Sequence, residues 1–270
     1  MDLIEIHQIF FEMLNELNII CKENGIKFHL DGGTLLGAVR EHNFSAWDDD
    51  VDISMLREDY EKLKKIANEK LKNKGMIFSE PYENTKNFYD FTSRIFYTKK
   101  NYRNDKIYIE NFNGLYRYVW IDIFIYDNID VKKKKFHFLK HKIVYGFAMG
   151  HRLKDKFFKE GKLFENIFAI LLSRIGKLIP LRIIYKWHNN LCKEFNSIDT
   201  KYIYCGNGPI SMIDYIDFKK IKEDIIENDF KNIKLPIIRE YDSYLKLLYG
   251  DYMKIPDDTE KKPKHKNNIF

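Results

Sequence analysis

The sequence of 270 residues has few cysteines and no long apolar run. Its three cysteines, Cys21, Cys192 and Cys205, are scattered without metal-ligand or redox spacing, and an odd number of dispersed thiols suits a reducing compartment. The longest purely apolar run, Ile167 to Leu172, is far too short to span a bilayer. The opening at Met1 lacks the basic stretch of a signal peptide. We therefore expect cytoplasmic residence.

Several functional motifs are also missing from the sequence. There is no Gly-x-Ser-x-Gly nucleophile elbow and no nucleic-acid recognition motif, so we expect neither a serine nucleophile nor a nucleic-acid partner. No pair of histidines has convincing zinc-ligand context. We therefore interpret five of the histidines as surface or packing residues: His7, His137, His141, His151 and His188.

What the sequence does have is a dense acidic cluster, WDDDVDI, from Trp47 to Ile53. Such close carboxylates must be solvated, protonated or neutralised by a cation. Val51 and Ile53 favour a strand, which would point Asp50 and Asp52 to the same side, about 7 Å apart. A calcium loop counted from Asp48 would need Gly and Glu where Ile53 and Asp59 stand, and is excluded. A solvated acidic loop is the remaining alternative, but it does not explain the flanking tryptophan and apolar strand.

A glycine pair lies just upstream, within HLDGGTLLGAVR. Residues 26–30 are predicted to form a short strand, and Gly32 and Gly33 a tight turn that lets the backbone approach a ligand. Thr34 is the expected N-cap of a helix that runs through Arg40. Because a helix N-terminus beside glycines binds phosphate well, this segment favours a nucleotide-phosphate site next to the acidic strand.

A third acidic position is Asp122, within YVWIDIFIYD. An ionised carboxylate in such an apolar run is costly unless it is paired or bound to metal. An edge strand with a solvated Asp122 would leave Trp120, Phe124 and Tyr126 in water on the same face. A central strand is therefore the better interpretation.

These segments together resemble the LicD family, whose members transfer phosphocholine from CDP-choline to cell-surface glycopolymers. The resemblance rests on GGTLLGAVR and WDDDVDI between Leu30 and Ile53, and on WIDIF at residues 120–124. It extends over nearly the whole chain to a closing block, which contains Leu235-Pro236, Tyr241 to Leu245, Leu248 to Met253, Pro256 and His265. The chain departs from the family at Ser45-Ala46, where the family usually has Ile-Pro.

The resemblance implies an α/β (α+β) fold with a nucleotidyltransferase-like mixed sheet flanked by helices. It implies that Asp50, Asp52 and Asp122 bind Mg²⁺ or Mn²⁺, as two ions that can clamp the oxygens of an in-line displacement. The expected substrate-binding residues are Gly32, Gly33, Thr34, Arg40 and Trp47, with Arg40 pairing with diphosphate. Asp48 and Asp49 are expected to orient the ligands or to hold the loop.

Charge is divided unevenly along the chain. Residues 132–193 contain 16 Lys and Arg against 3 Asp and Glu, a net +13 within a chain whose total is +6. Apolar residues at helical spacing predict two or three basic amphipathic helices here. They would lie on an anionic membrane surface, at the inner face of the cell membrane, or pack on the core as ordinary helices. We divide the chain into a catalytic core (1–130), this basic helical region (131–199) and a closing segment (200–270).

The spacing of apolar residues predicts helices and strands in the rest of the chain. Helices are predicted at residues 3–23 and 57–72, and strands at 76–79, 91–98 and 106–112, with turns at 83–84 and 113–114. Some of the 18 tyrosines and 21 phenylalanines could cage a quaternary ammonium such as choline, but the sequence does not identify which.

Three functional hypotheses follow. The first is an enzyme that transfers phosphocholine, or a similar substituted phosphate, from CDP-choline or a related donor to a hydroxyl of a teichoic acid, lipopolysaccharide, or another free or lipid-linked glycan. The second is a nucleotidyltransferase that moves the nucleotide of a nucleoside triphosphate instead. The third is a non-catalytic membrane-surface adaptor with a structural metal. The third is disfavoured because a structural site needs neither the distant Asp122 nor a phosphate-type glycine turn.

Overall fold

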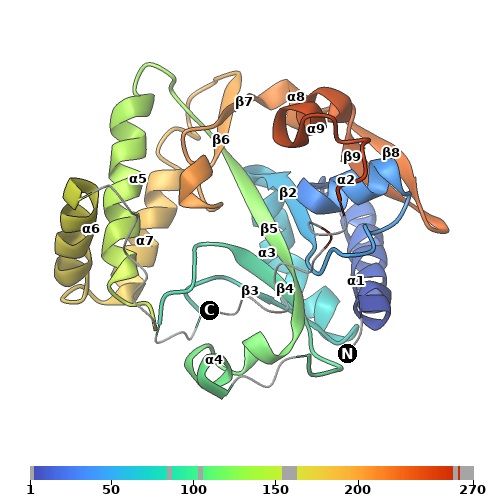
Figure 1. Ribbon diagram of the computed structural model, residues 1–270, viewed down its shortest axis with the longest axis horizontal. Helices are drawn as coiled ribbons and strands as arrows, with labels where there is room; N and C mark the ends of the chain where they lie inside the picture. The colour runs from blue at the N-terminus through green and yellow to red at the C-terminus, as the bar shows by residue number, and fades with distance from the viewer. Residues whose placement is uncertain (1–2, 84–86, 103–105, 154–162, 258–260, 262–270) are drawn as a thin grey trace.

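A curled mixed sheet flanked by helices forms the frame of the computed structural model, which describes residues 3–83, 87–102, 106–153, 163–257 and 261 (Figure 1). The strands follow the order β1 (His29–Leu30), β2 (Asp52–Leu56), β5 (Val119–Asn128), β4 (Ser93–Tyr97) and β3 (Met76–Ser79). β6 (Tyr202–Cys205) pairs with β5 and with β7 (Ile216–Phe218). Only the β2–β5 pair is parallel among the pairings of this described sheet. The predicted mixed α/β class is confirmed.

The long strand β5 occupies the centre of the sheet because both of its edges are paired. β2 pairs with residues 122–126, β4 with residues 119–123 and β6 with residues 126–128. Its odd-numbered residues Val119, Ile121, Ile123 and Ile125 are buried, whereas Asp122 is only partly buried. The prediction that Asp122 stands on a central strand is confirmed.

Two amphipathic helices bury their apolar stripes against the sheet, as predicted. α1 (Leu3–Glu23) buries residues at helical spacing, among them Ile6, Phe10, Met13 and Leu17. α3 (Arg57–Lys72) does the same with residues that include Tyr60 and Leu63. These side chains share one core with the strands, so the acidic residues of β2 and β5 stand on a well-packed platform.

α2 (Gly32–Arg40) starts earlier than predicted. Asp31, not Thr34, is the N-cap, and its carboxylate accepts a hydrogen bond from the backbone N–H of Gly32. Gly32 has φ +53°, a conformation that favours glycine. The preceding strand is also shorter than predicted, because the chain pairs with β2 only at His29 and Leu30.

The predicted strand at residues 106–112 is wrong. The chain forms α4 (Lys106–Asn111) and then η1 (Leu115–Arg117). Asn113 and Gly114 both have positive φ, which ends α4, and the Gly114 N–H donates to Ile109 O. Ile107 is exposed, so the apolar alternation that suggested a strand is not buried.

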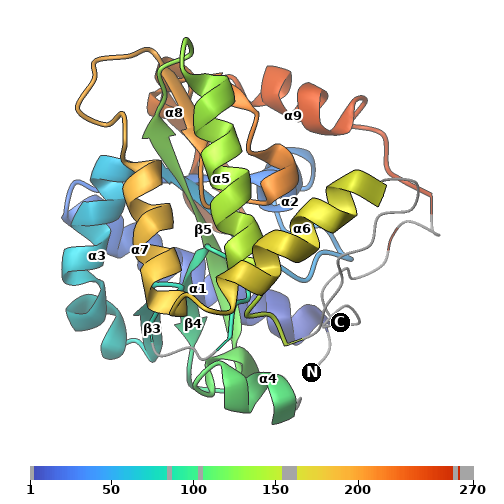
Figure 2. The same ribbon diagram turned by 90° about the vertical axis from the view of Figure 1, so that its left-hand side faces the viewer.

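The basic region folds into three helices on one side of the sheet (Figure 2). These are α5 (Lys134–Met149), α6 (Leu163–Gly176) and α7 (Leu181–Cys192). Gly146, Gly150 and Gly176 let α5 and α6 approach closely, because an added Cβ would overlap the facing helix. Residues 154–162, which carry part of the basic charge, lie outside the described residues.

The end of the chain returns to the sheet, where β9 (Ile233–Ile238) contacts β1 and α9 (Tyr241–Tyr249) contacts α2. η2 (Ile210–Met212) and β7 lead to α8 (Lys219–Glu223), the hairpin of β8 (Ile225–Phe230) and β9, and α9. The hairpin contributes Phe230, Leu235 and Ile237 to the main core. The resemblance residue His265 and the turn residue Asn84 lie outside the described residues. None of the helices described is both long enough and apolar enough to cross a membrane.

Candidate active site

The parallel pairing of β2 and β5 brings two predicted acidic residues side by side. Asp52 is the first residue of β2, and its Cα partner on β5 is Asp122. The Asp122 N–H donates to Val51 O over 2.9 Å, and the Asp52 N–H donates to Thr34 Oγ over 3.0 Å. Thr34 thus ties the first turn of α2 to the acidic strand, in place of its predicted capping role.

Asp31 is a further carboxylate of this site. Its Oδ1 accepts from Gly32 N over 2.8 Å and from the Tyr244 hydroxyl over 2.6 Å, and its Oδ2 accepts from Ser54 Oγ. Burial alone would raise the pKa of Asp31, but the charge of Lys222 and these donors hold it below its ordinary value. Asp31 is therefore a fixed anion that caps α2 and anchors α9.

A cavity of about 470 Å³ lies over these elements. Its lining residues form an acidic, glycine-rich group and a largely aromatic group, here called the acidic end and the aromatic end, which meet where the Tyr244 hydroxyl donates to Asp31 Oδ1. The acidic end is formed by Asp31, Gly32, Gly33, Asp48, Asp50 and Asp52. The other end is formed by Phe124, Tyr126, Cys205, Gly208, Pro209, Met212, Tyr215, Tyr244, Leu248 and Tyr249.

The two glycines lie directly against the carboxylates. A Cβ on Gly33 would fall 2.7 Å from Asp48 Oδ2, and one on Gly32 would fall 2.9 Å from Asp52 Oδ2. A larger residue at either position would therefore fill the space beside the acidic groups. The glycine pair is needed for this close approach as well as for the turn.

The charges of the neighbouring aspartates act strongly on Asp52. Burial, followed by the charges of Asp50, Asp122, Asp31 and Asp48, holds its pKa well above the ordinary value for an aspartate. The donor set is made of carboxylate oxygens, the ligands that hard divalent cations prefer. With the space left by the glycines, the residues at this end fit Mg²⁺ or Mn²⁺, which would relieve the repulsion.

Asp122 has a cationic partner that the sequence did not reveal. Its Oδ1 forms an ion pair of 2.7 Å with Arg94 Nε, and its Oδ2 accepts from Trp120 Nε1. Arg94 is itself buried and also pairs with Asp90 over 2.5 Å. Burial raises the pKa of Asp122 to about 6 although Arg94 opposes the shift.

The other predicted residues occupy different places. Asp49 and Asp122 line a small second cavity of about 20 Å³, and Asp50 lines both cavities. Arg40 stacks over the Trp47 ring at 5.4 Å and binds Glu41 and the Tyr252 carbonyl, so neither Arg40 nor Trp47 is among the residues that line the large cavity. The structure therefore gathers the acidic and glycine residues but leaves Arg40 and Trp47 outside the cavity wall.

Sequence reasoning missed most of the aromatic end. Phe124 and Tyr126 could have been found, because they follow Asp122 at two-residue steps along one face of β5. Tyr244 and Tyr249 belong to the closing block of the family resemblance, but nothing in the sequence places them, or Tyr215, in this cavity. Behind this wall the buried Lys222 ammonium lies 3.8 Å from the Tyr244 ring centroid and 4.8 Å from that of Tyr126.

Such a mixed sheet, with acidic residues on parallel neighbours β2 and β5 and a glycine-led helix beside them, defines a nucleotidyltransferase-like domain. Residues 25–150 match the family model of the LicD/FKTN/FKRP nucleotidyltransferase domain. This match confirms the resemblance to the LicD family that the sequence motifs indicate.

Similar proteins extend the match beyond that domain. The lipopolysaccharide cholinephosphotransferase LicD of Haemophilus influenzae is 24% identical over 273 aligned residues, which cover 95% of this chain and 93% of that protein. An uncharacterised protein of Rickettsia prowazekii is 29% identical over 128 residues, 47% of this chain and 46% of that protein. The relatedness to the Haemophilus protein therefore includes the basic helices and the closing segment.

Proposed function

We propose that the protein is an enzyme that transfers phosphocholine, or a similar substituted phosphate, from a CDP-linked donor to a hydroxyl of a cell-surface glycan. The observation that carries this proposal is the single cavity that joins an acidic, glycine-lined end to an aromatic end. The similarity to the Haemophilus cholinephosphotransferase supports the transferred group and favours lipopolysaccharide over teichoic acid as the acceptor.

The two ends suit the two parts of such a donor. Mg²⁺ or Mn²⁺, as two ions held by Asp50, Asp52 and Asp122, would neutralise charge on the diphosphate during the displacement. Gly32 and Gly33 allow the backbone near the N-terminus of α2 to approach phosphate oxygens. The acceptor oxygen forms a bond to the choline-bearing phosphorus, the bond to CMP breaks, and the hydroxyl proton passes to solvent.

The aromatic end suits a quaternary ammonium, which aromatic rings bind through their electron-rich faces. Lys222 already presents a cation to Tyr126 and Tyr244. Because like charges repel, we assign the choline group to the neighbouring rings of Phe124, Tyr215 and Tyr249. Tyr249→Leu is then expected to raise the KM for CDP-choline more than the KM for CDP-ethanolamine.

The test of the reaction is phosphorus NMR of the full chain incubated with Mg²⁺, CDP-choline and a glycan acceptor. Release of CMP with a phosphodiester product supports the proposal. Release of diphosphate from a nucleoside triphosphate supports the second hypothesis, a nucleotidyltransferase. Absence of turnover with either donor supports the non-catalytic adaptor.

The aspartate variants test the metal-binding assignment. Asp50→Asn, Asp52→Asn and Asp122→Asn each remove one ligand charge and keep the shape of the side chain, so each is expected to abolish turnover. Asp52→Asn removes repulsion and is expected to melt no lower than the wild-type protein in the absence of metal. Near-normal activity of Asp122→Asn at saturating Mg²⁺ would show that Asp122 pairs with Arg94 and does not bind a metal.

We further propose that the three basic helices bring the enzyme to an anionic membrane surface, where a lipid-linked acceptor would be presented from the cytoplasmic side. Large apolar side chains are exposed there beside the lysines: Phe136, Leu139, Ile167, Phe168, Leu171, Ile175 and Leu178. A helical surface that combines Lys with exposed Phe, Leu and Ile is typical of interfacial membrane binding.

A further inference from the structure

A second group of potential metal ligands lies between α5 and α7, away from the acidic cavity. His137 and His141 are one turn apart on α5, and His188 and Cys192 are one turn apart on α7. All four are buried. One ligand atom from each of His141, His188 and Cys192 lies within 4.8 Å of the other two.

We propose that His141, His188 and Cys192 form a binding site for one zinc ion. Imidazole nitrogen and thiolate sulfur are the ligands that Zn²⁺ prefers, whereas the carboxylates of the acidic cavity suit Mg²⁺ or Mn²⁺. His141 on α5 faces the i,i+4 pair His188 and Cys192 on α7, so the three side chains converge as ligands on facing helices do. The sequence interpreted His137, His141 and His188 as surface or packing residues, and all three are buried; the proposal adds a ligand role for His141 and His188.

The surroundings of His188 fit ligation. Its Nε2 lies 3.0 Å from Gly206 O, so Nε2–H donates there and Nδ1 is left to bind a metal. Cys192 Sγ is 3.8 Å from both ring nitrogens, close to the roughly 3.6 Å between a sulfur and a nitrogen on tetrahedral zinc. Binding requires the sulfur or the ring to shift toward the Nδ1 side.

His141 completes the group from the opposite helix. Its Nε2 lies 2.9 Å from the Tyr204 hydroxyl and 3.3 Å from His137 Nε2. Three protein ligands leave a fourth tetrahedral position for a water or for the Tyr204 hydroxyl. When the ion binds, the Cys192 S–H bond breaks, the sulfur forms a bond to zinc, and the proton leaves to solvent.

The location indicates a structural role for the ion. The ligands join α5 to α7, and the Gly206 carbonyl that orients His188 directly follows β6. The segment after Gly206 supplies Gly208, Pro209, Met212 and Tyr215 to the large cavity. Zinc would thus hold the basic helices against the segment that carries part of the aromatic wall.

Cobalt titration of the metal-free full chain tests the site directly. We expect one equivalent of Co²⁺ to give a thiolate-to-cobalt charge-transfer band, which Zn²⁺ then removes by displacement. The titration is made in the Asp52→Asn background, so that weaker binding at the carboxylates does not interfere. Cys192→Ser should lose the band, whereas Cys205→Ser, which removes a neighbouring thiol, should keep it.

The change in Tm on adding Zn²⁺ distinguishes loss of the metal site from misfolding of a variant. Zn²⁺ should raise the Tm of the wild-type protein and of Cys205→Ser, but not of Cys192→Ser or His141→Gln, because only native ligands stabilise the fold by mass action. Absence of the charge-transfer band in the folded parent protein would overturn the proposal. So would a band that persists in Cys192→Ser, or an equal Zn²⁺-induced Tm increase in His141→Gln.

Discussion

Gly33 and Gly37 both lie in α2, but a methyl group would meet different neighbours at each. At Gly33 the methyl group would meet the tip of the Asp48 side chain, which can move. At Gly37 it would fall 2.6 Å from Asn43 O and 2.9 Å from Ser45 N, which are backbone atoms. We expect Gly33→Ala to raise the KM for the nucleotide donor by roughly tenfold, about 1.4 kcal/mol, with little loss of stability. Gly37→Ala should destabilise the fold by about 2 kcal/mol or more.

Urea unfolding and donor kinetics of the two variants separate these effects. Gly37→Ala serves as the matched control, because the same methyl group is added in the same helix. An unchanged KM in a folded Gly33→Ala protein would count against the phosphate role of the glycine pair.

His29 makes the fold sensitive to acid. Burial, assisted by the charge of Lys222, lowers its pKa from 6.5 to about 4. Between about pH 6.5 and pH 4 the unfolded chain binds a proton at His29 that the folded chain does not bind. The free energy of unfolding therefore falls as the pH drops below about 6.5. The shift corresponds to a loss of roughly 3 kcal/mol by about pH 4.

Urea unfolding from pH 7 to pH 4 checks this prediction. His29→Gln should show a shallower decline with acid, whatever its stability at pH 7. His42→Asn changes an exposed histidine whose positive φ asparagine tolerates, and it should retain the wild-type slope. Equal slopes for wild type and His29→Gln would refute the assignment.

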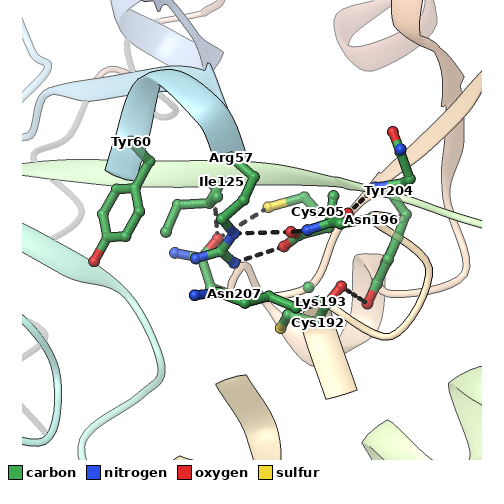
Figure 3. A network of polar contacts seen from close by, with 12 residues as sticks. Arg57, Tyr60, Ile125, Cys192, Lys193, Asn196, Tyr204, Cys205 and Asn207 are labelled. Carbon is green, nitrogen blue, oxygen red and sulfur yellow. Dashed lines mark hydrogen bonds and ion pairs between the residues drawn. The ribbon is translucent and has the colours of Figure 1, made fainter. Parts of the chain in front are cut away.

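At the scale of elements, a buried ion pair joins α3, β5 and the segment after α7 (Figure 3). Asp127 accepts from Arg57 Nε over 2.8 Å, from the guanidinium Nη2 over 2.6 Å and from Asn196 Nδ2 over 2.6 Å. Burial works against the Arg57 charge, but Asp127 raises the pKa of Arg57 above its ordinary value. Asp127→Asn should destabilise the protein by about 3–5 kcal/mol, because it leaves the buried guanidinium with only the partly exposed Glu61, 3.7 Å away, as counter-charge.

The control for this prediction is an exposed pair from the same region. Lys142 lies 2.8 Å from Asp214, and both side chains are about half exposed. Asp214→Asn should therefore cost less than about 1 kcal/mol. Chemical denaturation compares the two variants, and a similar cost for both would mean that burial does not strengthen the Asp127 contact.

The sequence predicted correctly those elements whose buried residues recur at regular helical or strand spacing. The helices at residues 3–23 and 57–72 bury regular apolar stripes, and residues 119–128 alternate along a central strand. The strand predicted at 106–112 failed because Ile107 stays exposed, and the cap predicted at Thr34 failed because Asp31 is better placed to accept from Gly32.

Prediction of the site was limited by distance along the chain. The glycine pair and the acidic cluster lie close together in sequence, so their juxtaposition followed from local structure. Arg94, Tyr215 and Tyr249 reach the site only through sheet pairing and the return of the chain end. The burial of His141 and His188 likewise depends on the packing of α5 against α7.

At the scale of the whole molecule, charge is concentrated in the helical side layer. Each Lys or Arg near an anionic bilayer contributes up to about 1 kcal/mol and is screened beyond a Debye length. Binding to anionic vesicles should therefore fall sharply as salt rises, and also when Lys132 to Lys135 are changed to Gln. Vesicle co-sedimentation measures binding, and turnover of a soluble acceptor analogue should barely change.

A matched change of charge tests whether the location of the lysines matters. Replacing Lys62, Lys65, Lys70 and Lys72 of α3 by Gln removes the same charge elsewhere and should leave more vesicle binding than the 132–135 variant. Equal binding to neutral and anionic vesicles would argue that the basic helices serve solubility and packing alone.

The central strand β5 also limits how this protein can change in length. Asp122, Phe124 and Tyr126 face one side at two-residue steps, and the Asp127 ion pair anchors the far end of the strand. A single residue inserted between Asp122 and Asp127 would turn every side chain on one side of the insertion to the opposite face of the sheet. An aliphatic side chain would then stand where a ring or carboxylate is needed. Only insertions or deletions in pairs preserve the alternation, so natural length variation among relatives should be even-numbered within this strand and unrestricted in the loops that flank it.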